Sequence, residues 1–170
     1  QLTDDCFAFG GELMLAAEAL ARLGKTTDIV ATPQEMSLQQ AHGRILAHDV
    51  VSARDVPPHD NAAVDGWAVF FDDLNPDRET SLPWSERIPA GQPLGHAAQR
   101  GVAVRIFTGA PMPGGEGGAP GPDTVLMQED CREQDGVVVI PPGIKQGANR
   151  RFAGEDIKND TVILSAGRRL

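Results

Sequence analysis

The sequence has no tyrosine and few aromatic residues of any kind. Its 170 residues include 6 phenylalanines and 2 tryptophans, so aromatic residues make up 5% of the chain. Hydrophobic residues still account for 41%. A core can therefore form, and it must be built mainly from valine, leucine, isoleucine and alanine. A chain of this length is expected to form one domain or two small subdomains.

Cysteine is almost as scarce. Cys6 and Cys131 are the only two cysteines, and they lie far apart in the sequence. This excludes a disulfide framework and a cysteine-based zinc site, and free thiols in a reducing cytoplasm are expected. The 4 histidines have no metal-ligand spacing, so the sequence predicts no metal site.

Positive charge is also in short supply, because 15 basic residues face 24 acidic ones and the net charge is −9. That balance argues against a nucleic-acid surface and against docking on anionic lipid. Local basic spots remain at Arg150-Arg151 and Arg168-Arg169. No apolar run approaches membrane-spanning length, and the N-terminus is acidic, unlike a signal peptide. The prediction is a soluble cytoplasmic protein that binds neither nucleic acid nor membranes.

Glycine and proline are abundant, with 19 and 13 residues. This content exceeds ordinary usage without reaching the level typical of disorder, and it predicts many turns between short strands. Residues 114–122 alone hold five glycines and two prolines. We expect this segment to be a mobile surface loop.

Two short helices are expected before a series of strands. Apolar residues recur at three- and four-residue spacing over residues 12–23, which predicts an amphipathic helix ended by Gly24. A second helix is expected from Thr32 to about Gln40, with Pro33 in its first turn and Gly43 as the break. Strands are predicted over residues 45–51, 82–88, 102–107, 124–128, 137–140 and 161–164. There is no βαβ alternation, so a Rossmann-type domain is excluded and a mainly β body is predicted.

Residues 60–68 form the first segment with possible chemistry. Asp55, Asp60 and Asp65 stand at five-residue intervals around the Pro57-Pro58 break, and small residues fill most of the gap before Trp67. The backbone here could approach a ligand or a neighbouring chain closely. The alternative is a capped turn that leads into a short apolar element over residues 67–71.

Two more segments share this character, and together the three carry a family resemblance. One is residues 105–113, followed after the loop by 125–129; the other is 151–157, continuing to 166–170. With residues 60–68, they resemble the N-terminal region of the molybdopterin molybdotransferase family, which includes MoeA and the E domain of gephyrin. The order and spacing of all three segments match from about Gly43 to Leu170.

The resemblance implies an α+β, mainly β fold of coiled and bifurcated sheets with N-terminal helices. It implies an elongated first subdomain, residues 1–50 with 142–170, and an inserted β-rich second subdomain, residues 51–141. Family members continue into a pterin-binding α/β domain and a C-terminal β-barrel. We therefore expect the chain to be a fragment of a larger enzyme.

Three positions match residues that the family associates with catalysis: Asp65, Thr108 and Asp156. Asp65 alternatively reads as a structural turn carboxylate. A hydroxyl followed by glycine at Thr108 is expected to leave neighbouring N–H groups open to an oxyanion, although an ordinary strand-to-turn transition would have the same sequence. Glu155 and Asp156 could share a cation if their carboxylates came close, and the resemblance assigns importance to Asp156.

Cofactor-binding positions implied by the same match are Asp60, Asn61, Gly66 and Gly109. The chain also departs from the family pattern, because Ala62, Val64 and Trp67 stand where serine, methionine and tyrosine are common. These changes keep the carboxylates but put in doubt any role for a hydroxyl at positions 62 and 67.

The resemblance implies that the full enzyme inserts molybdate into adenylylated molybdopterin and releases AMP, with Mg²⁺ present. The expected partners are a second copy in a homodimer, whose pterin-binding domain Asp65 and Thr108 would reach, and a protein that supplies adenylyl-molybdopterin. The fragment alone is expected to bind none of these cofactors and to be inactive. The alternatives are a non-catalytic dimerisation or scaffold module and an unrelated β domain that binds a small anion.

Overall fold

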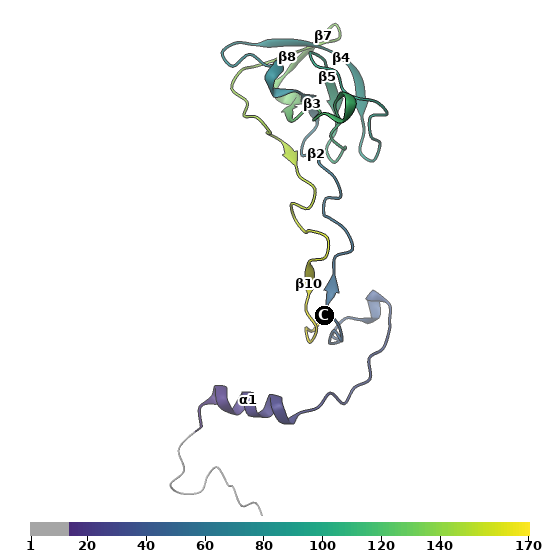
Figure 1. Ribbon diagram of the computed structural model, residues 1–170, viewed down its shortest axis with the longest axis vertical. Helices are drawn as coiled ribbons and strands as arrows, with labels where there is room; N and C mark the ends of the chain where they lie inside the picture. The colour runs from purple at the N-terminus through teal and green to yellow at the C-terminus, as the bar shows by residue number, and fades with distance from the viewer. Residues whose placement is uncertain (1–13) are drawn as a thin grey trace, which may run out of the picture. The chain divides into compact units, whose positions relative to one another are not determined.

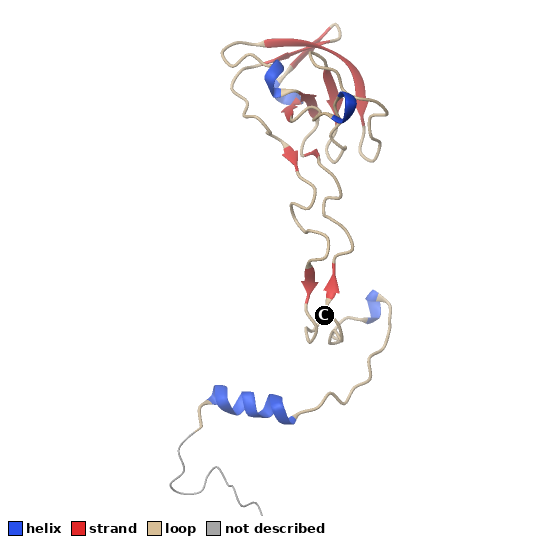
Figure 2. Ribbon diagram, viewed as in Figure 1, coloured by secondary structure: helices blue, strands red, loops and turns tan. Residues whose placement is uncertain are grey.

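The computed structural model describes residues 14–170, which divide into two compact units. One unit extends from the first described residues to Ala47 and includes Arg169–Leu170, and the other is His48–Arg168. Strands gather in the second unit, whereas the one α-helix of the described chain belongs to the first (Figure 2). The subdomain boundaries implied by the resemblance stay a prediction.

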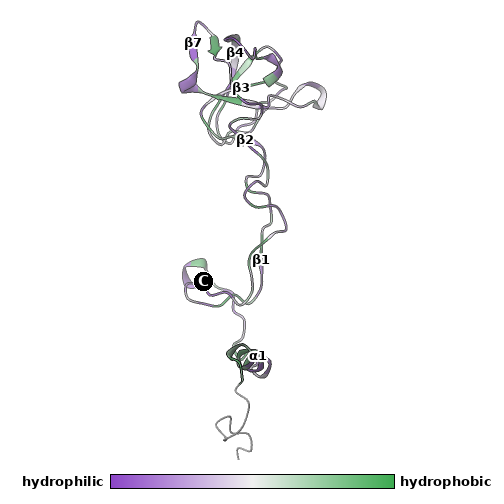
Figure 3. Cartoon of the chain, turned by 90° about the vertical axis from the view of Figure 1, so that its left-hand side faces the viewer, coloured by the Kyte–Doolittle hydropathy of each residue, from purple (hydrophilic) through white to green (hydrophobic). Residues whose placement is uncertain are grey.

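The first unit contains α1, Ala16–Thr26. The predicted helix began at residue 12, and residues 12 and 13 lie outside the described part of the chain. The predicted end at Gly24 is wrong, because the helix runs on and the Leu23 carbonyl accepts hydrogen bonds from the hydroxyls of Thr26 and Thr27 at 3.1 and 2.9 Å. None of the helical residues is buried, and hydrophobic residues lie along one side of α1 (Figure 3).

The second predicted helix is also wrong for most of its length. Only a 3-10 turn, Leu38–Gln40, forms there. The preceding Ile29 and Val30 are 94% and 97% exposed, so no apolar face packs against a partner to stabilise a longer helix. The break at Gly43 is confirmed, since this residue has φ 78° and its N–H donates to the Leu170 carbonyl at 2.8 Å.

A six-stranded sheet forms the body of the second unit (Figure 1). Its order is β6-β3-β5-β4-β8-β7, with β4 and β5 parallel and the other neighbours antiparallel. The mainly β prediction is confirmed. Its strands are β3 Gly66–Val69, β4 Thr80–Ile88, β5 Ala103–Ile106, β6 Thr124–Met127, β7 Arg132–Gln134 and β8 Val137–Ile140.

Strand β4 pairs with two different strands along its length. Thr80 to Pro83 pair with β8, whereas Trp84 to Ile88 pair with β5, with a register shift between Trp84 and Glu86. A β-bulge of this kind bends a strand. The sheet therefore curls, and β3, β5 and β6 contribute buried side chains on both of its faces.

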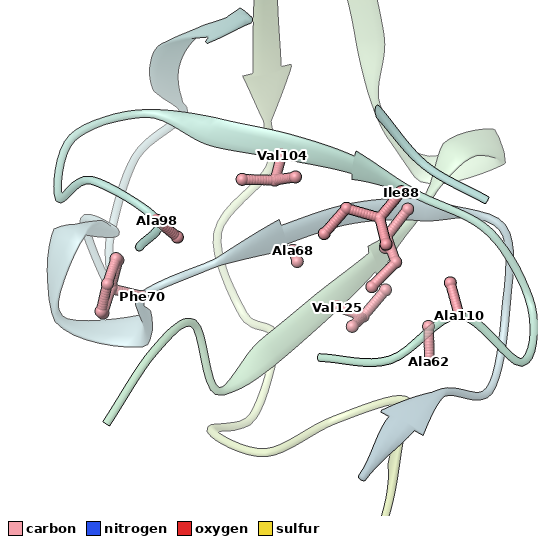
Figure 4. Packing of buried hydrophobic residues seen from close by; sticks show 9 residues of the cluster. Ala62, Ala68, Phe70, Ile88, Ala98, Val104, Ala110 and Val125 are labelled. Carbon is pink, nitrogen blue, oxygen red and sulfur yellow. The ribbon is translucent and has the colours of Figure 1, made fainter. Parts of the chain in front are cut away.

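The core consists of two clusters, and β3 contributes to both. Ala68 and Phe70 join one cluster, while Trp67 and Val69 join the other, because successive side chains point to opposite faces of a strand. In the first cluster Ala62 and Ala110 lie next to each other, near Val125 (Figure 4). As predicted from the low aromatic content, the core is mostly aliphatic: Ala62, Trp67, Ala68, Val69, Phe70, Leu82, Ile88, Ala98, Ala103, Val104, Ile106, Ala110, Val125, Leu126, Val138 and Ile140.

Two extended segments, residues 48–62 and 150–168, run antiparallel beside each other (Figure 1). Strand β1, Val50–Val51, pairs with β10, Val162–Leu164, and β2, Asn61–Ala62, pairs with β9, Arg150–Arg151. An isolated bridge joins Val56 to Ile157. The strand predicted over residues 45–51 is thus confirmed only at its end, because the chain bends at Ala47 and His48.

The remaining elements are short 3-10 turns: Phe71–Asp73, Glu116–Gly118 and Gln128–Asp130. The turn at Glu116 lies inside the glycine- and proline-rich loop, whose ends are buried at Pro113 and Pro122. A Cβ at Gly121 would lie 1.9 Å from the Pro113 carbonyl oxygen, so the two ends of the loop require glycine there. Within the described chain, no helix has the length and apolar character needed to cross a membrane.

Candidate functional site

The three sequence segments that carry the family resemblance meet around β2. The Ala62 N–H donates to the Ala110 carbonyl at 3.0 Å, and the Gly109 N–H donates to the Ala62 carbonyl at 2.8 Å. On the other edge, Asn61 and Ala62 pair with β9. Residues 60–66 therefore lie between segments 107–113 and 149–156, which are distant in sequence. The candidate site is this junction.

Asp65 and Thr108 form a direct pair at the junction. The Asp65 Oδ1 accepts the Thr108 N–H at 2.8 Å and the Thr108 hydroxyl at 2.7 Å. These hydrogen bonds, first from the hydroxyl and then from the N–H, lower the pKa of Asp65 from its ordinary value, with a smaller contribution from the charge of Arg105. The carboxylate is thus held ionised and oriented, while Thr108 is exposed to solvent.

The expectation that N–H groups around Thr108 stay open for an oxyanion is wrong. The Thr108 N–H and hydroxyl donate to Asp65, and the Gly109 and Ala110 N–H groups donate to Ala62 and Phe107 carbonyls, both at 2.8 Å. With these donors occupied, the exposed Thr108 hydroxyl can act toward a ligand only as an acceptor. Among the described contacts, the Asp65 Oδ2 has no hydrogen-bond partner either. The pair therefore offers acceptor oxygens, which suit a cation better than an anion.

Gly109 and Gly66, both predicted to bind a cofactor, have clear structural reasons to be glycine. Gly109 has φ 78°, a left-handed conformation in the turn that follows β5. At Gly66 a Cβ would lie 1.7 Å from the Leu126 carbonyl oxygen of β6. The close backbone approach expected near Trp67 is thus made by a neighbouring strand.

Asp60 is held by two partners from the β9 region. Its carboxylate forms an ion pair with Arg150, and its Oδ1 accepts the Ala153 N–H at 2.8 Å. Partial burial acts to raise the pKa of Asp60, but the hydrogen bonds from Arg150 and Ala153 outweigh it and leave the pKa lowered. Neighbouring Asn61 is only 8% exposed and contributes backbone pairing to Arg151 and Pro111.

Asp156 is engaged with Arg151 and does not contact the Asp65–Thr108 pair. The Arg151 Nη2 donates to the Asp156 Oδ1 at 2.6 Å, and its Nε donates to the Glu155 Oε1 at 3.2 Å. These hydrogen bonds, led by the one to Asp156, raise the pKa of Arg151. The cation that Glu155 and Asp156 could share is therefore the guanidinium of Arg151.

Three aspartates join the two extended segments, and two of them, Asp55 and Asp60, belong to the regularly spaced set. Asp49 accepts the Ala166 N–H at 2.7 Å, and Asp55 accepts the Asn159 N–H at 2.8 Å. Together with Asp60, they join residues 48–62 to the antiparallel segment 150–168 at three points along its length. The structural alternative was stated for Asp65, which does accept a backbone N–H, from Thr108; like Asp49 and Asp55, it has no described hydrogen-bond partner for its Oδ2.

Sequence reasoning did not identify the arginines that organise the junction. Arg150 and Arg151 were noted only as a basic spot, and Arg105 only as part of a segment. The guanidinium of Arg105 lies over the Trp67 and Phe107 rings, 5.0 and 4.8 Å from their centroids. The local charge pattern around residues 150–156 could have suggested the Arg151 contacts, but the pairing of Arg150 with Asp60 spans 90 positions.

Free cysteine chemistry plays no part in the junction. Cys131 is a free thiol, and burial raises its pKa to about 11, so it stays protonated at neutral pH. Within residues 14–170, no group of three or more histidine, cysteine or acidic side chains is arranged to hold a metal ion. Cys6 lies outside the described residues.

Comparison with protein families agrees with the geometry. A family model described as "MoeA N-terminal region (domain I and II)" matches residues 14–170. The chain is similar to a molybdopterin molybdenumtransferase of Haemophilus influenzae, with 37% identity over 136 residues that cover 79% of this chain and 32% of the relative. A molybdopterin molybdenumtransferase of Nostoc sp. is 39% identical over 138 residues, covering 79% of this chain and 30% of the relative.

The fold is similar to that of a solved protein. The crystal structure of the molybdopterin biosynthesis moeA protein from Pyrococcus horikoshii OT3 matches with a TM-score of 0.71 and 32% sequence identity, over 81% of this chain and 35% of that chain. The chain spans about a third of the length of the curated relatives named above.

Proposed function

Because this chain belongs to the family of MoeA N-terminal regions, we propose that it is the N-terminal part of an enzyme of molybdenum cofactor biosynthesis. The reaction we propose is the insertion of molybdate into adenylylated molybdopterin with release of AMP. The relatives named above are molybdenumtransferases, and they are about three times as long as the region they share with this chain. The rest of the machinery is proposed to lie in further domains of the full-length protein.

The observation that carries the proposal is the convergence of the three family segments on one junction. Asp65 and Thr108 are 43 positions apart in sequence and are joined by two hydrogen bonds. A fixed, ionised carboxylate with a free oxygen and an exposed threonine oxygen would hold a cation, and that cation would in turn hold the anionic molybdate and adenylate. Holding molybdate and adenylate together in the correct geometry is the main contribution expected of such a site.

The residues present fit a Mg²⁺ ion that is held largely by its substrate. Mg²⁺ commonly takes only one or two carboxylates from the protein and completes its shell with substrate phosphates and water. Asp65 would hold it through Oδ2, with Thr108 beside it. When bound, the ion would neutralise phosphate charge during AMP release.

The remaining site residues are proposed in supporting roles. Asp60, with Asn61 beside it, would fix the entry to β2, and Asp156 would face the substrate from the Arg151 side. Gly66 and Gly109 would contribute by letting the backbone keep this geometry. We also propose a homodimer in which Asp65 and Thr108 reach the partner's pterin-binding domain, a supplier of adenylyl-molybdopterin as a further partner, and a cytoplasmic location.

A second candidate function is a non-catalytic dimerisation or scaffold module. The observation that favours it is the exposed apolar side of α1, where Leu15, Leu20 and Leu23 are 75%, 68% and 59% exposed. An apolar surface of this kind commonly marks an interaction site.

The experiment that separates the two functions is an insertion assay with the full-length protein. Purified protein is incubated with adenylylated molybdopterin, molybdate and Mg²⁺, and AMP release is measured beside reconstitution of an apo-molybdoenzyme. The enzyme releases AMP in proportion to the cofactor that it forms. A scaffold releases none above the background without protein, and that result would refute the proposed reaction.

A further inference from the structure

Arg105 lies in the six-stranded sheet and is joined by a hydrogen bond to Gly66, next to the candidate site. It lies on β5, where its Cα pairs with that of Trp67 on β3 and with that of Arg87 on β4. The Cζ of its guanidinium lies over two rings, 5.0 Å from the centroid of Trp67 and 4.8 Å from that of Phe107. A planar cation between two aromatic residues has little freedom to move.

The hydrogen bonds of Arg105 reach the residues that flank the Asp65–Thr108 pair. Its Nη1 donates to the Gly66 carbonyl at 3.1 Å, directly after Asp65. Its Nη2 donates to the Gln128 side chain, and the backbone N–H of Gln128 donates to the Asp65 carbonyl at 3.0 Å. The guanidinium also lies over the ring of Phe107, the residue that precedes Thr108 in the sequence. The Arg105 side chain thus contacts the sequence neighbours of both Asp65 and Thr108.

We propose that Arg105 is a positioning residue that sets the geometry of Asp65 and Thr108 for the reaction. The inference rests on the proposed function and deepens it. Arg105 donates to Gly66 and Gln128, and no described hydrogen bond joins its guanidinium to the side-chain oxygens of Asp65 or Thr108. It acts by fixing where the free oxygens of the pair point.

Lysine cannot replace arginine in this role. A lysine keeps the positive charge but is a point donor without the planar fork, so it cannot stack between the rings and bond two acceptors in fixed directions. Arg105→Lys therefore separates charge from geometry. Arg87→Lys is a matched control, because Arg87 is exposed and lies over the same Phe107 ring at 5.1 Å, yet it has no hydrogen bond among the described contacts.

The test uses full-length protein labelled with ¹⁵N-threonine and measures hydrogen exchange of the Thr108 amide, which donates to Asp65. Arg105→Lys is expected to speed this exchange about tenfold, whereas Arg87→Lys leaves it close to wild type. In the insertion assay, kcat is expected to fall about tenfold or more with KM within about twofold, because geometry is lost without loss of a substrate contact.

Unchanged Thr108 exchange in Arg105→Lys would overturn the inference, and so would an equal change in Arg87→Lys. Exchange needs no turnover, so a wild-type protein without insertion activity would refute the proposed function while the exchange result still decides the role of Arg105. If Arg105→Lys does not yield folded protein, Gln128→Met removes one acceptor of Arg105 at an exposed position. That variant is expected to speed Thr108 exchange in the same direction, and unchanged exchange would contradict the role.

Discussion

At the scale of single residues, the aspartate carboxylates differ in the hydrogen-bond donors that they bind. Asp49 and Asp55 each accept a backbone N–H from the opposite extended segment, which is a purely structural use of a carboxylate. Asp65 also accepts a backbone N–H, from Thr108, and differs in accepting a side-chain hydroxyl on the same oxygen. Residue type and spacing do not distinguish these aspartates, whereas the contact with the Thr108 hydroxyl does, and the role of Asp65 in the reaction stays a prediction.

Asp60 makes the acid stability of the protein depend on its ion pair with Arg150. Its pKa is lowered in the folded protein, whereas an unfolded aspartate titrates at about 3.9. The stability that Asp60 contributes is present above about pH 4 and is lost as the pH falls toward its folded pKa. Asp60→Asn should therefore be less stable than wild type at pH 7, with a smaller difference at pH 3.

Urea unfolding at the two pH values measures this difference. Asp77→Asn serves as the control, because Asp77 is exposed and its carboxylate has no described contact, so its midpoint should follow wild type at both pH values. An Asp60→Asn deficit of equal size at pH 7 and pH 3 would show that the charge of Asp60 contributes no stability.

The contacts of the candidate site residues could not be predicted from the local sequence, and their catalytic roles stay predictions. Asp65, Thr108 and Asp156 were chosen from a resemblance, and the first two are joined in space. The oxyanion role of Thr108 was wrong because it depends on which N–H groups neighbouring strands already use. Such pairing is set by segments more than 40 positions away, and no local pattern encodes it.

At the scale of secondary structure, β3 and β6 determine whether the junction can form. These strands approach so closely at Gly66 that a Cβ would clash with the Leu126 carbonyl oxygen at 1.7 Å. Backbone atoms of a strand that is paired with its neighbour cannot move aside as the end of a flexible side chain can. Glycine at this position is therefore explained by sheet packing.

Gly66→Ala is expected to lower the free energy of unfolding by at least about 3 kcal/mol. The comparison is Gly95→Ala, since Gly95 is exposed and a Cβ there would meet nothing within 4 Å. That control should stay within about 0.5 kcal/mol of wild type. Urea unfolding gives the free energy of unfolding of both variants. A Gly66→Ala protein as stable as the control would contradict the close contact between the two strands.

Strands were predicted more accurately than helices, and the reason is physical. Residues 137–140 are valine and isoleucine throughout, and β8 has those bounds because a buried strand favours β-branched residues. The helix expected from Thr32 had capping residues but no partner surface, and only a 3-10 turn, Leu38–Gln40, forms there. Strands β2, β7 and β9 were missed because two or three residues carry no periodic signal.

At the scale of the whole molecule, the proposed active site lies between two copies of the full-length protein. If Thr108 acts on substrate bound by the partner, Thr108→Ala should be rescued by a variant inactive only in the downstream domain. Random subunit exchange in an equal mixture should restore about a quarter of wild-type activity, because half of the dimers then hold one intact site.

Mass spectrometry of differently tagged chains confirms the exchange, and unmixed samples of each variant provide the baseline. Mixed dimers that recover no activity would mean that Thr108 acts within its own chain or has only a structural role.

The most direct test of the central claim is Asp65→Asn in the full-length protein. Asparagine keeps an oxygen that can accept the hydrogen bonds from Thr108, but it removes the charge that a Mg²⁺ ion or an ordered adenylate requires. The variant and wild type are compared by cofactor insertion into an apo-molybdoenzyme and by thermal melting. We predict that insertion falls about a hundredfold or more while the melting temperature stays within about 2 °C of wild type. Normal insertion with a lowered melting temperature would contradict the account, because Asp65 would then be a structural turn residue.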